Sequence, residues 1–254
     1  MLWPRPKRIA LDTLARLVRA EGLGELFRAL APVAEWRRQA ENEALDRQLR
    51  EECARLGWLD QRGRLDVDVA AALAVLCRPT TEYFGWITAG PSTAGVLAGA
   101  IGRQAVVAVS MDGWVTVRST RLENLARMLV AQLPDIPAGQ GQPFTVRQSD
   151  LLAFDPGQRR HGGVAVRPVP LEVRRFHHLA SLERTGAGEL YVAVRDGVGR
   201  HHVLAEPICY TDTVVGRYVT VRTTRGREAE TLVAPVNPPD LVARLHQAQA
   251  SLGQ

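Results

Sequence analysis

Residues 82–133 read EYFGWITAGPSTAGVLAGAIGRQAVVAVSMDGWVTVRSTRLENLARMLVAQL, and this stretch decides the fold. Its short runs of alternating apolar and polar residues indicate strands, and Asp112-Gly113 is a strong signal for a tight hairpin turn. The pattern predicts four consecutive strands followed by an amphipathic helix that begins near Arg121. The predicted strands are Glu82–Thr88, Thr93–Ile101, Gln104–Met111 and Trp114–Ser119.

A second stretch, residues 189–252, repeats this plan. Apolar residues match between the copies at a constant spacing of 116 positions, as in Val117 and Val233, Leu125 and Leu241, and Leu129 and Leu245. A unit that occurs only twice does not indicate a solenoid, which needs three or more copies. The predicted strands of the second copy are Glu189–Arg195, Arg200–Tyr210, Gly216–Thr224 and Thr231–Val236, with a helix from about Pro238.

The two copies predict an α+β fold in which a central antiparallel β-sheet carries flanking helical bundles. We expect a pseudo-twofold internal repeat of helix, four-strand meander and helix. The 254 residues then form a single domain. Its predicted parts are an N-terminal helical region at 1–65, halves at 66–133 and 171–252, and a linker at 134–170. Helices cover one face of such a sheet, and the other face, where it is left open, offers a broad surface to a partner.

The composition is that of an ordinary globular protein, with 46% hydrophobic and 23% charged residues. No apolar run approaches the roughly 20 residues that span a bilayer, and the N-terminus lacks the pattern of a secretion signal. These features predict a cytoplasmic location without membrane insertion. Cys53, Cys77 and Cys209 are widely spaced and odd in number, so we expect small buried side chains without disulfides.

The sequence contains no motif that indicates catalysis. It has no H-x-x-x-H or C-x-x-C metal pattern, no P-loop lysine and no G-x-S-x-G nucleophile elbow. His177-His178 and His201-His202 are neighbours whose side chains diverge in a helix or a strand, so neither pair grips one ion easily. We therefore predict a protein that is not an enzyme, with no catalytic, cofactor-binding or metal-binding residue. Binding is the class of function that remains.

Nucleic acid is the alternative partner. A helix predicted at Ala34–Leu56 is followed by one at Asp66–Cys77, a spacing that suggests a helix-turn-helix, and the net charge is +5. A recognition helix offers cations and base-reading side chains near its start. The second of these helices instead begins with Asp66 and Asp68 and has no arginine before Arg78. A structural bundle is the favoured interpretation, no nucleic acid is expected, and a nucleic-acid-binding regulator stays as the alternative.

Several segments, in this order and spacing, resemble the EspG family of type VII (ESX) secretion-associated proteins. The resemblance extends from about residue 57 to the C-terminus, and its most specific parts lie at residues 212–218 and 233–241. The matching segments are Gly57–Asp66, Leu76–Pro79, Gly102–Val106, Leu133–Gly139, Asp212–Tyr218 and Val233–Leu241.

The resemblance implies a cytosolic chaperone and adaptor without enzymatic activity or cofactor. It would bind a secreted helical protein, a PE–PPE-like heterodimer or a WXG-type protein, keep it soluble and guide it to the ESX machinery, whose membrane components would be further partners. A homodimer also stays open. The family's grip on its substrate, by the sheet face, a strand of the second half and a loop between the second and third strands, points here to Ala100–Gln104 and Arg200–Tyr210. The implied partner-binding residues are Ile101, Gly102, Arg103, Gln104, Arg200, His202, Leu204, Glu206, Ile208 and Tyr210.

Overall fold

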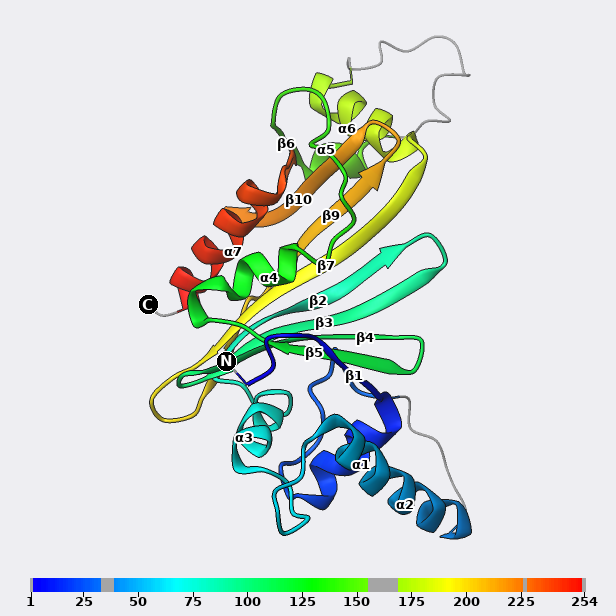
Figure 1. The fold of residues 1–254 in the computed structure, drawn as a ribbon. Coiled ribbons are helices and arrows are strands. Elements are labelled where there is room, and N and C mark those ends of the chain that lie inside the picture. Colours follow the sequence, from blue (N-terminus) through cyan, green and yellow to red (C-terminus); the bar gives the residue numbers. More distant parts are fainter. Residues whose placement is uncertain (1, 33–38, 155–168, 226–227, 253–254) are drawn as a thin grey trace.

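The computed structural model describes residues 2–32, 39–154, 169–225 and 228–252. Over these residues one 11-stranded sheet runs through the molecule in the order β1-β5-β4-β3-β2-β7-β9-β10-β11-β6, with β8 paired to β7 (Figure 1). All pairings between these strands are antiparallel. The α+β class and the central antiparallel sheet are therefore confirmed.

The first meander follows the prediction closely. Its strands are β2 (Thr81–Ala89), β3 (Ser92–Ile101), β4 (Gln104–Met111) and β5 (Trp114–Ser119). Asp112 takes a left-handed backbone, φ 51°, in the predicted hairpin turn. A 3₁₀ turn, η1 (Leu122–Asn124), and the helix α4 (Leu125–Val130) follow.

The second meander joins the first edge to edge, because β7 (Arg184–Arg195) pairs with β2 along its length. The next strands are β8 (His201–Val203), β9 (Ile208–Thr213), β10 (Gly216–Arg225) and β11 (Glu228–Pro235), and the helix α7 (Pro238–Leu252) follows. The pseudo-twofold relation of the halves, and the domain limits, stay predictions.

The prediction of a single strand at Arg200–Tyr210 is wrong. The structure has β8 and β9 there, with Leu204–Pro207 between them. β8 pairs with the end of β7 and β9 with its beginning, so the chain steps along the edge of β7 between the two pairings. Pro207 has no N–H to donate to a ladder, which suits a break at this place.

Two short strands extend the sheet at its edges. β1 (Lys7–Ala10) pairs with β5 and was not predicted, since four residues are too few for an alternation to stand out. β6 (Phe144–Arg147) pairs with β11 and precedes the helix α5 (Gln148–Leu152).

Helices cover the two faces unevenly. α4 and α7 lie on one face, which we call the covered face, where Leu125, Leu129, Leu241 and Leu245 pack on residues of both meanders (Figure 1). The remaining helices are α1 (Leu11–Ala20), α2 (Gln39–Leu56), α3 (Val67–Val75) and α6 (Leu171–Ser181).

The N-terminal helices pack on the opposite face of the first meander. Leu14, Leu73 and Phe84 belong to this second core, which is separate from the core under α4 and α7. Asp66 caps α3 as predicted, because its carboxylate accepts hydrogen bonds from the amides of Asp68 and Val69. The predicted start of α2 near Ala34, and the middle of the predicted linker, lie outside the described residues.

The cysteines behave largely as expected. All three are free; Cys53 is buried, while Cys77 and Cys209 are half-buried. Burial raises the pKa of the Cys53 and Cys77 thiols to about 11, so both stay protonated at neutral pH.

Candidate functional site: an open sheet face

One row of paired residues crosses the sheet on the face opposite α4 and α7. The registers align Trp86 of β2 with Glu189 of β7, Glu189 with Cys209 of β9, and Cys209 with Thr220 of β10. We call these four residues the open row. Trp86, Cys209 and Thr220 are half-buried and Glu189 is exposed, although all four lie in the interior strands of the sheet.

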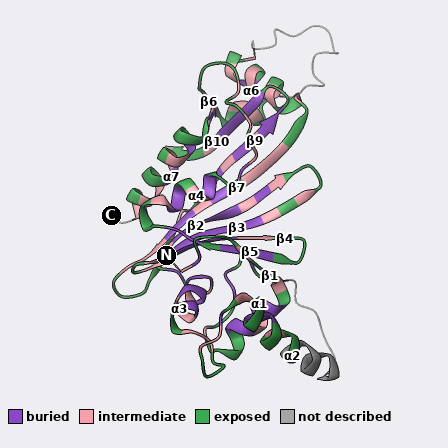
Figure 2. Cartoon of the chain, viewed as in Figure 1, coloured by how far each residue is buried: buried purple, intermediate pink, exposed green. Residues whose placement is uncertain are grey.

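The covered face of the same strands is much more deeply buried. Leu190, Val192 and Val219 are each 0% exposed, and they point toward α4 and α7 because neighbours in a strand alternate between faces. In Figure 2 buried residues dominate the middle of the sheet, and exposed ones gather at strand ends, turns and helices. The second meander is thus closed on one face and incompletely covered on the other.

Aromatic side chains from β2 and β7 form a cluster beside the open row. Phe84 stacks on Tyr191 with ring centroids 5.1 Å apart, and Trp86 meets Tyr191 edge to face at 6.1 Å. The guanidinium of Arg28 lies over all three rings, 4.5 Å from the centroid of Phe84 and 5.6 Å from that of Tyr191. The Tyr191 hydroxyl donates to Glu189 at 3.0 Å, which orients that carboxylate. Phe84, Trp86 and Tyr191 therefore form an ordered aromatic cluster, which we call the platform, with Arg28 over its rings and Glu189 held beside it.

The predicted contact residues at Ile101–Gln104 form a two-residue turn between β3 and β4. Ile101 and Gln104 pair with each other, and Gly102 has φ 54°, a conformation that glycine adopts without strain. Gly102, Arg103 and Gln104 line a shallow cavity of about 590 Å³, together with residues 119–123. This turn lies at the same end of the sheet as the β7–β8 hairpin, since both adjoin the start of β2.

The predicted contact residues of the second half are separated by the break in the strand. Arg200 and His202 are exposed in the β7–β8 hairpin, where His202 contacts Asp196 at 3.0 Å. Glu206 is exposed and Leu204 half-buried in the connection.

Ile208 and Tyr210 are only 4% and 1% exposed, in the core under α7, so the expectation that they form an accessible surface is wrong. Leu204, Ile208 and Tyr210 lie on the same side of the sheet, and that side is the covered one. Cys209 and Thr211, which alternate with Ile208 and Tyr210 along β9, face the open side. A sequence signal for the open row does exist in β7, where Glu189 and Tyr191 alternate with the apolar Leu190 and Val192.

A buried carboxylate lies under the rim of this surface. Glu82 is 0% exposed; His201 contacts one of its oxygens at 3.1 Å, and the guanidinium of Arg195 lies 3.8 Å from the other, which lacks a hydrogen bond. Burial raises the pKa of Glu82, against the opposing effects of His201, Arg195 and Arg28.

This raised pKa predicts how stability changes with pH. A carboxyl whose folded pKa is raised stabilises the fold at low pH, and that contribution is lost as the pH rises through the folded pKa. Glu82→Gln should therefore raise the melting temperature relative to wild type at pH 8, and the difference should shrink toward pH 4. The exposed Glu206→Gln serves as the control. A lower melting temperature of Glu82→Gln at pH 8 would mean that attraction to the nearby cations outweighs the cost of burial.

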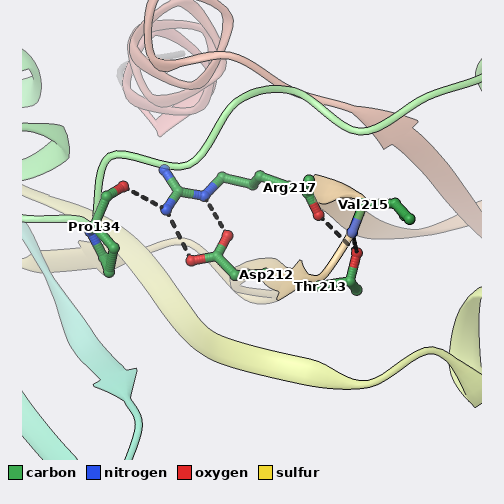
Figure 3. Close-up of polar contacts among 6 residues, drawn as sticks. Pro134, Asp212, Thr213, Val215 and Arg217 are labelled. Atoms are coloured by element: carbon green, nitrogen blue, oxygen red, sulfur yellow. Dashed lines mark hydrogen bonds and ion pairs between the residues drawn. The ribbon is translucent and has the colours of Figure 1, made fainter.

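A buried ion pair fixes the linker to the second meander. Arg217 and Asp212, 1% and 0% exposed, form two hydrogen bonds of 2.6 and 2.8 Å, and the guanidinium also donates to the carbonyl of Pro134 at 2.8 Å (Figure 3). The Tyr218 hydroxyl accepts a hydrogen bond from the backbone amide of Gln140 and donates one to its backbone carbonyl. These contacts join residues of the segment 212–218 to the proline-rich segment that follows Leu133.

The described residues show neither a metal cluster nor a reactive thiol in the open row. Among them, no group of three or more histidine, cysteine or acidic side chains is placed to hold a metal ion. The thiol in the open row, Cys209, has its pKa raised by burial, so it is a poor nucleophile at neutral pH. Within the described part of the chain, none of the helices combines the length and apolar character needed to cross a membrane.

Comparison with known proteins identifies the family of this chain. The model of the EspG family matches residues 10–247. The fold is similar to that of EspG5, the type VII secretion system chaperone of Mycobacterium tuberculosis, whose structure was solved in complex with a PE25–PPE41 dimer. The TM-score is 0.69 at 14% sequence identity, and the match covers 98% of this chain and 97% of that chain. The search of curated proteins finds no significant match. Since the family model spans nearly the whole chain, this protein belongs to the EspG family.

Proposed function

We propose that this protein is a non-enzymatic chaperone that binds a helical PE–PPE-like heterodimer in the cytoplasm, keeps it soluble and delivers it to the ESX secretion machinery. Membership of the EspG family supports the class of function. The similarity of fold to EspG5, solved with a PE25–PPE41 dimer, supports the kind of client. Delivery to the machinery, and contact with its membrane components, are the further steps of this proposal.

The single observation that carries the proposal is the incompletely covered surface formed by the platform and the open row, which share Trp86. An apolar helix end aggregates in water, and a complementary apolar surface removes it from solvent. Aromatic side chains flanked by polar groups are typical of the energetic centre of such interfaces. Arg28, over the rings, and Glu189, beside them, supply one charge of each sign, and opposite charges of a client would fix its orientation.

The residues at Ile101–Gln104 and Arg200–Glu206 remain in the proposal as a second contact. They gather at one end of the sheet, beyond the platform. Arg103 and Arg200 add positive charge there, suited to an acidic part of the client. Ile208 and Tyr210 would act only indirectly, since they support the strand from the covered side.

Co-expression tests the proposal directly. The chain should form a complex with a PE–PPE pair from the genome that encodes it, and the complex should survive size exclusion at a 1:1:1 ratio. The pair expressed alone should aggregate. Failure of every such pair, and of WXG-type proteins, to co-elute with the chain would contradict the proposal.

Trp86→Ala is expected to weaken client binding about thirtyfold, the typical effect of removing an aromatic hot spot worth about 2 kcal/mol. Trp114→Ala is a matched control, because Trp114 is also a partly exposed tryptophan in a strand. The guanidinium of Arg8 lies over its ring, 4.5 Å from the ring centroid. Isothermal titration with the purified pair would compare the two variants. Equal losses for both would remove the platform from the binding site.

The geometry of α3 does not support the nucleic-acid hypothesis. The start of α3 is occupied by the Asp66 cap and by Asp68, and its apolar side packs in the N-terminal core. A salt-dependent gel shift at physiological ionic strength would revive that alternative.

A further inference from the structure

A groove follows the free edge of β6. This strand is the last in the order of the sheet, so half of its backbone N–H and C=O groups point away from β11, and no described strand pairs with them. A cavity of about 480 Å³ is lined by Pro143 and by all four residues of β6. Consecutive strand residues point to opposite faces, so a cavity that meets all four lies along the edge of the strand.

The helices α5 and α6 border this groove. Figure 1 shows both beside β6 at this end of the sheet, and the lining includes Asp150 of α5 and Glu172 and Val173 of α6. Val146 and Val173 are 2% and 0% exposed and supply its apolar part. An exposed sheet edge is the surface to which several peptide-binding domains add an extended peptide as a further strand, through main-chain hydrogen bonds.

The two arginines of the groove are already engaged. The guanidinium of Arg147 lies 3.8 Å from the carboxylate of Glu228 and 3.9 Å from that of Glu230. The guanidinium of Arg175 lies over the ring of Phe144, 5.3 Å from its centroid. These contacts leave little positive charge for a ligand.

The two acids of the groove, by contrast, have no partner among the described residues. The carboxylates of Asp150 and Glu172 make no ion pair and accept no hydrogen bond there, although both side chains are half-buried. Each lies in the first turn of a helix, where the helix dipole favours an acid. That preference leaves their oxygens without a donor, and a partly buried carboxylate gains from a cation. The groove therefore complements a basic ligand.

We propose that this groove binds an extended, basic peptide segment of a second partner protein, which adds to the sheet as a strand beside β6. Main-chain hydrogen bonds hold the segment, and its lysine or arginine side chains pair with Asp150 and Glu172. The groove is separate from the open row, because Thr220 of β10 ends that row and β11 lies between β10 and β6. The chain therefore holds its client and this partner at the same time. The peptide site does not depend on the proposed chaperone function, whereas simultaneous binding does.

Three fluorescein-labelled peptides test the groove by fluorescence anisotropy. TVKVRVT should bind the wild-type chain, and TVEVDVT should bind at least tenfold more weakly. TVKPRVT keeps both cations, but its proline removes an N–H and interrupts a strand, so it should also bind at least tenfold more weakly. Equal binding of TVKPRVT and TVKVRVT would mean that charge alone attracts the peptide, and failure of TVKVRVT to bind would exclude the site. Either result overturns the proposal.

Charge reversal in the chain locates the site. The double variant Asp150→Lys, Glu172→Lys should weaken binding of TVKVRVT at least tenfold and strengthen binding of TVEVDVT, a gain that loss of folding does not produce. The matched control is Glu183→Lys, Glu206→Lys, which changes the net charge equally at two exposed acids outside the groove. The control should bind all three peptides like wild type. Equal effects of the two double variants would overturn the proposal.

Competition distinguishes the other occupants. A saturating PE–PPE pair should leave the affinity for TVKVRVT unchanged. If the pair displaces the peptide, the groove belongs to the client and the second-partner proposal is overturned. If the free chain is a dimer that TVKVRVT dissociates, a second copy occupies the edge and the proposal is also overturned. If no pair binds the wild-type chain, the proposed chaperone function fails, while the peptide measurements still decide whether the groove is a binding site.

Discussion

Asp212→Ala is expected to lower the free energy of unfolding by about 3–5 kcal/mol, because it leaves a buried guanidinium without its counter-charge. Arg217 is 1% exposed, and its remaining partners would be the carbonyl of Pro134 and the ring of Tyr210, 4.8 Å from the guanidinium. Neither neutralises a positive charge. Urea denaturation followed by circular dichroism would measure the loss.

The control is an ion pair on the surface. Arg19 and Glu25 contact each other at 2.9 Å, but their side chains are 54% and 71% exposed. Glu25→Ala should therefore cost about 0–1 kcal/mol. The double variant Asp212→Leu, Arg217→Met should recover much of the loss, since well-packed apolar residues can replace a buried pair. A cost for Asp212→Ala no larger than that for Glu25→Ala would show that water reaches Arg217.

The same variant should also loosen the linker. Ala138 pairs with Arg217 in a short parallel bridge, and Gly139 lies against the ring of Tyr218. Without the Asp212 carboxylate, the guanidinium that donates to the Pro134 carbonyl is no longer held in place, so amide hydrogen exchange should rise in residues 134–140 before the sheet unfolds.

The sequence specified the strands far better than the surface. β4 and β5 begin and end where the alternation and the Asp112-Gly113 turn predict, because both signals are local. The break between β8 and β9 depends on which stretch of β7 each pairs with; Pro207 is a local sign of a break, but it does not reveal the pairing. The open row likewise exists only because β7 lies between β2 and β9, a long-range arrangement.

The misplaced contact residues have a simple physical origin. A period of two separates Ile208 and Tyr210 from Cys209 and Thr211, but it does not say which set a helix will cover. α7 follows the second meander and lies over the first set, so these large side chains are core and the small polar ones face outward. The size of the side chains was the available clue, because full exposure of isoleucine and tyrosine in a central strand would cost free energy.

Gly95→Ala is the second change from which we expect a large effect. Gly95 lies in β3, opposite Trp86, and a Cβ built there would be 1.7 Å from the carbonyl oxygen of Ala29 and 2.9 Å from its carbonyl carbon. Both atoms belong to the backbone and cannot rotate away. The segment that carries Arg28 must therefore move off the sheet, at a cost of about 1–3 kcal/mol or more.

The displacement should also reach the binding surface. Arg28 stacks on Phe84, Trp86 and Tyr191 from that same segment, so its shift would leave the platform without its cation. We expect Gly95→Ala to lower the melting temperature and to weaken client binding together. Gly197→Ala is the matched control, because a Cβ at Gly197 meets no atom within 4 Å and its backbone is not left-handed. If Gly95→Ala behaved like Gly197→Ala in both measurements, the N-terminal layer would not be held against β3 at this contact, and the platform would need another support.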